Sequence, residues 1–267
     1  MFLVNGVPAD SISLTDRSFQ YGDGCFTTML TRNGSIQWWP LHVERMNACL
    51  DVLHISRPDW NQVEIWLNTI INKERRAGIK LHISRGEGGR GYSPTQVASP
   101  NVTISDFIYP SHYEQWLDQG LKLGICQARL GHNPLLAGHK HNNRLEQVLL
   151  KAEMDQANLH DGLALDIDDC VIETTMANIF WRQGDVLKTP DLTKAGVAGV
   201  MRRVILEWAT NNHLAVEVGQ FKLADVLSAD EVFITNSVLG AAPICQIGEQ
   251  AFAIGKITKR IQEMVNS

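Results

Sequence analysis

The spacing of hydrophobic residues changes several times along this chain, and that change is the strongest constraint on its fold. Residues 41–53 and 60–77 carry apolar side chains at helical spacing, whereas residues 79–83 alternate apolar and polar as a strand does. Mixed periods of this kind predict an α/β protein rather than an all-helical or all-strand one. Further helices are expected at 142–156, 223–227 and 257–265, and further strands at 2–4, 102–109, 121–128, 161–166, 171–175 and 231–234.

The chain is long enough for one large domain or two of ordinary size, since it has 267 residues. A polar stretch at 111–119 follows Pro110 and is the best candidate for a linker. We therefore expect an N-terminal α/β subdomain at 1–110, a linker at 111–119 and a C-terminal α/β subdomain at 120–267. In the second subdomain, the helix at 142–156 is expected to bury the apolar face formed by Leu145, Val148, Leu149 and Met154.

Composition narrows the class of partner. The net charge is −5 and no basic block occurs, so nucleic acid is not expected as a partner. The five cysteines are scattered without a CxxC pair, which argues against a metal site and a disulfide framework and suits a reduced compartment. No signal peptide and no run of eighteen apolar residues occurs, so we expect a cytoplasmic protein without a membrane span.

A lysine between two histidines stands just ahead of the helix at 142–156. In the segment 138–147, Lys140 lies between His139 and His141, and Arg144 lies one helical turn further on. Nearby cationic groups or burial lower the pKa of a lysine and free its amine for Schiff-base chemistry. The alternative is a solvated lysine at a helix start.

An acidic residue, Glu173, interrupts the apolar strand at 171–175. It is either solvated on the outer face or buried against a charged partner, because burial without a partner is costly. A pyridinium nitrogen is one such partner, and the carboxylate would keep it protonated so that the ring acts as an electron sink.

Three features of the sequence are suited to binding an anion such as phosphate. Glycines at 196 and 199 open a helix, and the free N–H groups at a helix start attract anions. Arg45 on the helix at 41–53 could clamp a phosphate, and Ser237 follows a strand end where a phosphate cup could form. Each could equally be ordinary: a plain helix entry, a solvated charge and a turn.

Two glycine-rich stretches lie in the first half. The Gly22-Asp23-Gly24 turn leads into a strand, and the segment 84–93 contains four glycines with Arg85 and Arg90. Glycine lets a backbone approach a ligand closely, and guanidinium groups hold carboxylates in a bidentate grip. A simple turn and a flexible surface hairpin are the alternatives.

Taken together, these stretches resemble the fold-type-IV pyridoxal-phosphate enzymes, the group of the branched-chain aminotransferases and D-amino-acid transaminases. The resemblance covers nearly the whole chain and implies two α/β subdomains with the cofactor between them. It rests on five segments in this order, at 21–26, 41–46, 138–144, 173–180 and 199–202.

The resemblance implies a role for each candidate residue. Lys140 would carry pyridoxal 5′-phosphate and act as general base, Glu173 would pair with the ring nitrogen, and Thr28 would assist protonation of the leaving group. The phosphate would be held by Arg45, by the N–H groups of Val200 and Met201, and by Ser237. The substrate's carboxylates would be held by Arg85, Arg90 and Tyr92.

The resemblance also implies a reaction. The segments at 20–28, 84–93 and 140–147 favour a lyase of this group that eliminates pyruvate from 4-amino-4-deoxychorismate, a step of folate and 4-aminobenzoate biosynthesis. The alternative is a branched-chain or D-amino-acid aminotransferase of the same fold. The family is homodimeric, so a homodimer is expected as well.

Overall fold

The computed structural model describes residues 1–97 and 99–266, which divide into two compact units. The first unit comprises Met1–Tyr109 and His139–Asn143, and the second comprises Pro110–Gly138 and Arg144–Ser267. The segment carrying Lys140 therefore packs with the first unit, although we expected it in the C-terminal subdomain. Both units contain a sheet and helices, as the mixed hydrophobic periods predicted.

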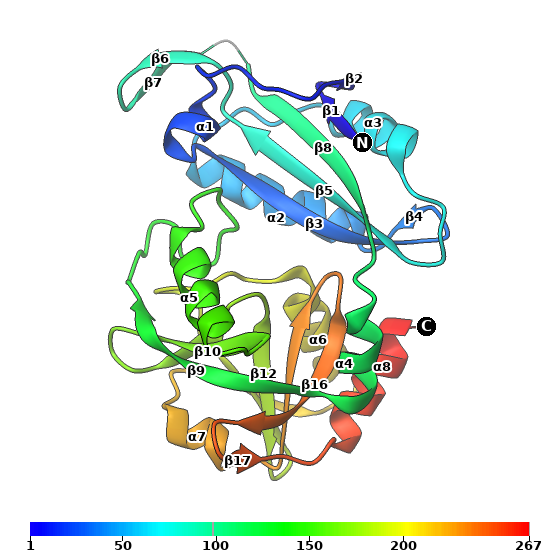
Figure 1. Ribbon diagram of the computed structural model, residues 1–267, viewed down its shortest axis with the longest axis vertical. Coiled ribbons are helices and arrows are strands. Elements are labelled where there is room, and N and C mark those ends of the chain that lie inside the picture. The colour runs from blue at the N-terminus through cyan, green and yellow to red at the C-terminus, as the bar shows by residue number, and fades with distance from the viewer. Residues whose placement is uncertain (98, 267) are drawn as a thin grey trace. The chain divides into compact units, whose positions relative to one another are not determined.

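The first unit is built on a six-stranded antiparallel sheet with the strand order β2-β1-β8-β5-β3-β4 (Figure 1). Its strands are β1 (Phe2–Val4), β2 (Val7–Pro8), β3 (Gly24–Arg32), β4 (Ser35–Ile36), β5 (Ala77–Ser84) and β8 (Asn101–Ile108). A separate hairpin consists of β6 (Gly88–Arg90) and β7 (Ser93–Val97). The helices are α1 (Arg17–Tyr21), α2 (Trp39–Val52) and α3 (Trp60–Ile70).

The two faces of this sheet differ because side chains alternate along a strand. On β3, Cys25 and Met29 are buried in a core that includes Met46 of α2 and Val63 of α3. Phe26 and Thr28, which alternate with these residues, point to the opposite face and are half-buried. That second face carries the polar side chains described below.

The second unit is built on a nine-stranded mixed sheet with the order β11-β10-β9-β16-β15-β12-β13-β14, and β17 pairs with β16. Its strands are β9 (Leu121–Leu130), β10 (Asp161–Asp166), β11 (Val171–Thr174), β12 (Asn178–Gln183), β13 (Val186–Pro190), β14 (Ala215–Gly219), β15 (Glu231–Asn236), β16 (Gly240–Ile247) and β17 (Gln250–Ala251). Its helices are α4 (His112–Gln119), α5 (Leu145–Gln156), α6 (Val200–Asn211), α7 (Leu223–Leu227) and α8 (Lys256–Asn266). α4 and α8 pack on β16, and α5 packs on β9 and β10.

Three further expectations differ from the structure. Residues 111–119, expected as a linker, contain the whole of α4, because the aromatic side chain of Trp116 is buried in the core of the second unit. The helix expected at 60–77 ends at Ile70, and the polar residues after it precede β5.

The third difference concerns α5, whose expected apolar face points mostly to solvent. Leu145, Val148 and Leu149 are 76%, 58% and 66% exposed, while Leu150 and Met154 are buried. Only Met154 of the expected face packs inward. The helix therefore carries a second apolar face that the second unit does not bury.

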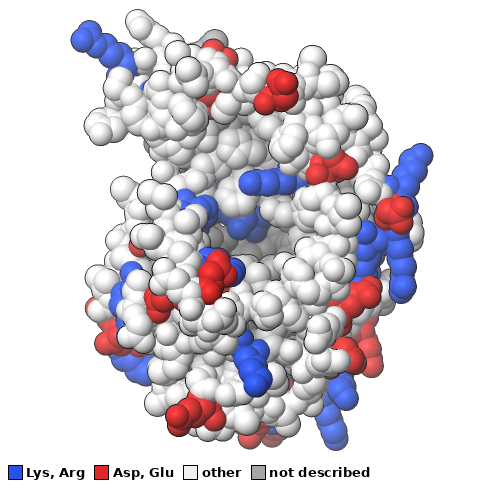
Figure 2. Space-filling model, in the orientation of Figure 1, with Lys and Arg blue, Asp and Glu red and all other residues white. Residues whose placement is uncertain are grey.

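Basic and acidic side chains are interspersed over the molecular face shown in Figure 2, in keeping with the modest net charge. Among the described residues, no helix is both long and apolar enough to cross a membrane.

Candidate active site

The segment 139–143 is fastened to the start of β3 by backbone hydrogen bonds. The Phe26 N–H donates to the Lys140 carbonyl oxygen at 3.1 Å, and the Asn142 N–H donates to the Gly24 carbonyl oxygen at 2.9 Å. A Cβ atom at Gly24 would lie 2.1 Å from the Ile83 carbonyl oxygen and 2.5 Å from the Asn142 amide nitrogen. The second glycine of the Gly-Asp-Gly turn is therefore required by the close approach of this segment.

The Lys140 side chain lies beside an aromatic ring on the half-buried face of the sheet. Its Nζ is 4.5 Å from the centroid of the Phe26 ring, and the Lys80 Nζ is 4.8 Å from the same centroid. An aromatic face attracts ammonium groups. Thr28 is directly opposite Lys80 in the strand register. Lys140, the predicted base, and Thr28, the predicted proton donor, therefore share this face of the sheet. Lys80 lies on the same face and was not expected from the sequence to belong to the site.

Two histidines support the segment that carries Lys140: His139 within it, and His82 on β5, which was not expected from the sequence. Burial lowers the pKa of His139, so this ring is neutral near pH 7. His82 lies opposite Phe26 in the register, and burial followed by the charge of Lys80 lowers its pKa to about 4. Its Nε2 is 3.3 Å from the Ser18 hydroxyl, which also accepts a hydrogen bond from Asn142 at 2.9 Å. A neutral imidazole therefore helps to anchor the segment that carries Lys140.

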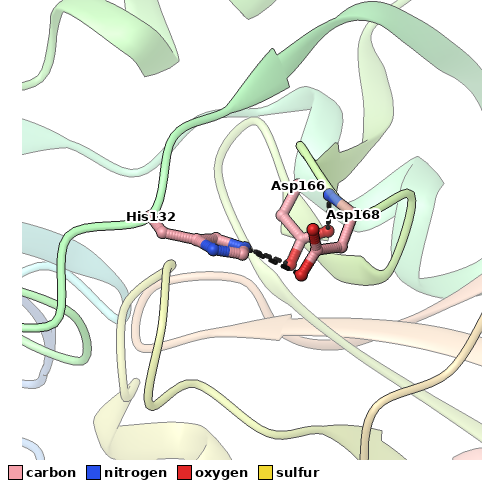
Figure 3. Close-up of side chains that lie close together, drawn as sticks. All are labelled: His132, Asp166 and Asp168. Carbon is pink, nitrogen blue, oxygen red and sulfur yellow. Dashed lines mark hydrogen bonds and ion pairs between the residues drawn. The ribbon is translucent and has the colours of Figure 1, made fainter.

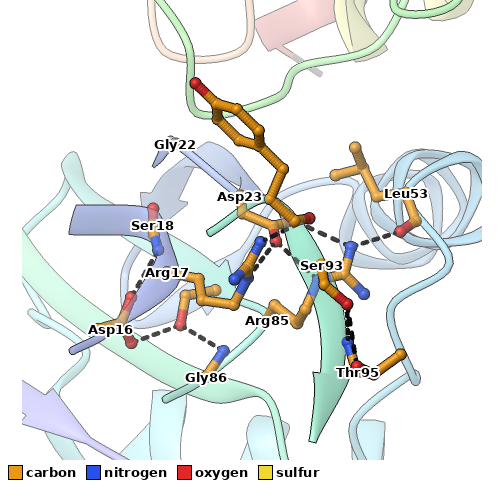
Figure 4. Close-up of polar contacts among 12 residues, drawn as sticks. Asp16, Arg17, Ser18, Gly22, Asp23, Leu53, Arg85, Gly86, Ser93 and Thr95 are labelled. Carbon is orange, nitrogen blue, oxygen red and sulfur yellow. Dashed lines mark hydrogen bonds and ion pairs between the residues drawn. The ribbon is translucent and has the colours of Figure 1, made fainter. Parts of the chain in front are cut away.

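The glycine-rich turn and the glycine-rich loop are joined by a half-buried carboxylate, Asp23 (Figure 4). Both Arg17 and Arg85 bind it, at 2.9 and 2.7 Å through their Nε atoms, and Arg85 adds a second contact of 3.0 Å. Burial alone would raise the pKa of Asp23, but the hydrogen bonds from Arg85 and Arg17 hold it below the usual value. Arg85 also donates to the carbonyl oxygens of Leu53 and His54.

The three residues predicted to bind substrate carboxylates differ in their surroundings. Arg85 uses four of its five N–H donors within the protein, which gives its side chain a structural task. Arg90 and Tyr92 are exposed on the hairpin formed by β6 and β7. Arg17 fixes that hairpin by donating to the carbonyl oxygens of Gly91 and Tyr92. The hairpin is therefore held on the Asp23 network rather than free.

Arg45 on α2 has a donor to spare. It donates one hydrogen bond to the Thr27 hydroxyl, and its Nε is buried without a hydrogen-bond partner among the described residues. Burial lowers the pKa of Arg45 to about 10, so the guanidinium is still charged at neutral pH. A buried, charged and unsatisfied donor is costly unless an anion binds it, and a phosphate fits this requirement.

In the second unit, Glu173 is buried, which decides between the two predicted settings for this carboxylate. The residue is only 5% exposed on β11, and its Oε2 accepts a hydrogen bond from the Val197 N–H at 3.0 Å. The acidic group predicted to face a pyridinium nitrogen is thus held within the protein and not solvated.

The start of α6 presents backbone N–H groups. Its N-cap, Gly199, offers no side-chain cap to the first turn, which contains Val200 and Met201. Asn178 fixes the approach, because it donates to the Val197 carbonyl oxygen at 2.7 Å and accepts from the Gly199 N–H at 3.1 Å. A Cβ atom at position 199 would lie 2.2 Å from the Asn178 Oδ1. Such a helix start suits an anion.

Ser237 lies half-buried in the turn between β15 and β16. The preceding residue, Asn236, shapes this turn by accepting hydrogen bonds from the N–H groups of Val238 and Leu239. Ser237 is thus on an ordered turn, as a member of a phosphate cup must be.

One cluster in the second unit has the composition of a metal site. His132, Asp166 and Asp168 bring ligand atoms within 4.8 Å of one another (Figure 3). The hydrogen bonds around them account for the cluster: His132 Nε2 is 2.9 Å from Asp166, which also accepts from the backbone of Asp168 and Cys170. The ammonium of Lys194 lies 3.3 Å from Asp168. The arrangement locks the turn between β10 and β11.

Comparison with known proteins places these features in a family. The model of the amino-transferase class IV family matches residues 24–247. The chain is 52% identical to the aminodeoxychorismate lyase of Vibrio harveyi, with 100% of both chains covered. It superposes on the crystal structure of 4-amino-4-deoxychorismate lyase from Pseudomonas aeruginosa with a TM-score of 0.93 and 36% identity, covering 100% of this chain and 98% of that one.

A more distant match shows the fold alone. The PLP-bound form of a hypothetical aminotransferase from Mycobacterium tuberculosis superposes with a TM-score of 0.85 at 15% identity, covering 100% of this chain and 97% of that one. The chain belongs to the class IV amino-transferase family, a family of pyridoxal-phosphate enzymes with the type IV fold. Within it, the full-length identity groups the chain with the aminodeoxychorismate lyases, and the aminotransferases are only distant relatives.

Proposed function

We propose that this enzyme converts 4-amino-4-deoxychorismate into 4-aminobenzoate and pyruvate, using pyridoxal 5′-phosphate. The observation that carries the proposal is the 52% identity to an aminodeoxychorismate lyase over the full length of both chains. The surroundings of Lys140, Arg45 and Glu173 support it, because each offers a group that this cofactor requires.

In this proposal, the cofactor is held at both its ends. Lys140 would hold the aldehyde group, and the carboxylate of Glu173 would pair with the ring nitrogen. The phosphate is bound by Arg45, by the N–H groups of Val200 and Met201, and by Ser237. The unsatisfied Nε of Arg45 and the uncapped start of α6 support these assignments. When bound, the cofactor supplies a protonated ring that withdraws electrons from the carbon bearing the substrate amine.

The residues of the chain then move protons. The amine of Lys140 would take the proton from the substrate carbon that bears nitrogen. As the carbon–oxygen bond to the enolpyruvyl group breaks, the hydroxyl of Thr28, on the same sheet face as Phe26, would protonate the methylene carbon of that group, which leaves as pyruvate. The substrate ring becomes aromatic, which draws the reaction forward.

Binding of the substrate carboxylates is assigned to Arg90 and Tyr92, with Arg85 contributing its one remaining N–H donor. The Asp23 network supports this assignment, because it holds the hairpin that carries both exposed side chains. Rigid placement of binding groups lowers the entropy lost when a ligand binds.

The test is a product assay with the purified holoenzyme and 4-amino-4-deoxychorismate. We expect 4-aminobenzoate and pyruvate in equal amounts without an added keto acid. Transfer of an amino group from branched-chain or D-amino acids to 2-oxoglutarate, with no pyruvate formed, would identify an aminotransferase instead.

We also propose a homodimer in the cytoplasm. The exposed apolar side chains of Leu145, Val148 and Leu149 support a protein–protein contact, since exposed apolar patches mark interaction surfaces. The five cysteines are free thiols, which suits a reduced compartment. Sedimentation of the wild-type enzyme and of Leu149→Lys tests the contact: we expect a dimer for the former and a shift toward monomer for the latter. A monomeric wild type would contradict it.

A further inference from the structure

Two fully buried polar residues of the first unit are linked to Arg45 by hydrogen bonds. Thr27 on β3 and His42 on α2 are each 0% exposed, and the Thr27 Oγ1 lies 2.6 Å from the His42 Nδ1. Arg45, one helical turn after His42, donates a hydrogen bond to the same Thr27 oxygen. Neither Thr27 nor His42 was expected from the sequence to have a role.

The direction of the Arg45 hydrogen bond follows from its chemistry. A guanidinium group has only donors, so the Thr27 oxygen accepts from Arg45. The same hydroxyl is linked to the His42 Nδ1, either by donating its proton or by accepting one through its second lone pair. Burial, and then the charge of Arg45, hold the pKa of His42 well below its usual value, which keeps the ring neutral. The His42 Nε2 is buried without a hydrogen-bond partner among the described residues.

The chain of bonds fixes one end of Arg45 and leaves another end available. An arginine side chain loses considerable rotamer freedom when it is immobilised, and a hydrogen bond made in advance reduces the loss on binding. Here one terminal nitrogen is held by Thr27, whereas Nε keeps an unsatisfied donor.

We propose that Thr27 and His42 are positioning residues that orient Arg45 toward the cofactor phosphate, an inference that rests on the proposed role of Arg45. Neither residue touches the cofactor in this arrangement. Thr27 acts by accepting from the guanidinium, and His42 acts by holding the Thr27 hydroxyl through the 2.6 Å hydrogen bond, so that its oxygen stays turned toward Arg45.

The test compares two ligands of the apoenzyme, pyridoxal 5′-phosphate and pyridoxal, which lacks the phosphate. Thr27→Val removes the hydroxyl with little change in volume. We expect it to raise the dissociation constant of pyridoxal 5′-phosphate about tenfold, as loss of an orienting residue does at other sites, and to leave that of pyridoxal unchanged. Thr27→Ser keeps the hydroxyl and should bind both ligands as the wild type does.

The inference is overturned if Thr27→Val binds pyridoxal 5′-phosphate as tightly as the wild type, or weakens both ligands equally. Should Thr27→Val not give folded apoprotein, His42→Phe serves in the same comparison, with the same selective loss expected and the same results against it. Arg45→Gln separates the phosphate-binding role of Arg45 from the positioning role of Thr27 and His42. If Arg45→Gln leaves the affinity for pyridoxal 5′-phosphate unchanged, the assignment of Arg45 to the phosphate fails. If Arg45→Gln weakens this affinity and Thr27→Val does not, only the positioning role fails.

Discussion

The two units hold their candidate functional groups in different ways. In the first unit the segment that carries Lys140 is held by backbone hydrogen bonds, but Asp23 and Arg45 are held by other side chains. In the second unit the candidate groups are held by the backbone, as Glu173 is by the Val197 N–H, and the helix start itself supplies donors. The first arrangement depends on the chemistry of single side chains, and the second depends on the path of the chain.

This difference predicts where substitutions act. Replacing one polar side chain in the first unit should disturb a defined network, whereas in the second unit the same chemistry survives unless the backbone moves. The following substitutions test the comparison, beginning with the largest expected effect.

Lys140→Ala should abolish covalent cofactor attachment and lower turnover by at least about a thousandfold, because it removes the anchor and the base together. The absorbance of the bound cofactor and a pyruvate assay measure both effects. Lys80→Ala is the matched control, since this second lysine lies beside the same aromatic ring. Retained covalent attachment in Lys140→Ala would show that a different lysine is the anchor.

Asp23→Ala should destabilise the protein by about 3 kcal/mol, because two largely buried guanidinium groups lose their shared carboxylate. Denaturant unfolding measures the change. Asp51→Ala removes a carboxylate from an exposed arginine pair in the same unit and should leave stability nearly unchanged. Equal effects of the two substitutions would contradict the structural role of the Asp23 network.

Glu173→Gln should retain the cofactor but slow the reaction by about tenfold to a hundredfold, since a neutral amide cannot stabilise the ring charge. Because the Val197 N–H can bond an amide oxygen equally well, stability should change little. The rate of pyruvate formation and the thermal midpoint measure the two parts. An unchanged rate would count against the electron-sink role.

His82→Gln should flatten part of the acid dependence of stability. The pKa of His82 is lowered to about 4, so between pH 6.5 and 4 the unfolded chain binds a proton that the folded protein does not. The free energy of unfolding therefore decreases as the pH is lowered through this window, by up to about 1.4 kcal/mol per pH unit. His42 adds the same trend to both proteins, so their difference isolates His82. Identical slopes would exclude the contribution.

Much of the fold followed from periodicity, because local spacing fixes which residues can share a face. The strand β1, the helix α2 and the strand β10 formed as expected. The apolar face of α5 was predicted wrongly, since spacing identifies an apolar stripe but not whether this unit covers it. The length of α3 was overestimated, because the residues after Ile70 carry no strong signal for the end of a helix.

The candidate site was predictable where one segment contains its own signal, as Lys140 and the glycines before α6 do. Thr27 and His42 were missed because their contact joins a strand to a helix, although the spacing of His42 and Arg45 by three residues was a usable sign. Lys80 and His82 were missed for a related reason. They are the polar members of an alternating strand, and only the register with β3 places them beside Phe26 and Thr28.

The covalent link between Lys140 and the cofactor is tested most directly by borohydride reduction of the holoenzyme, followed by peptide mapping. We expect a single pyridoxyl group on the peptide that contains Lys140. A pyridoxyl group on another lysine, such as Lys80, or on none, would contradict the assignment of the anchor and of the base.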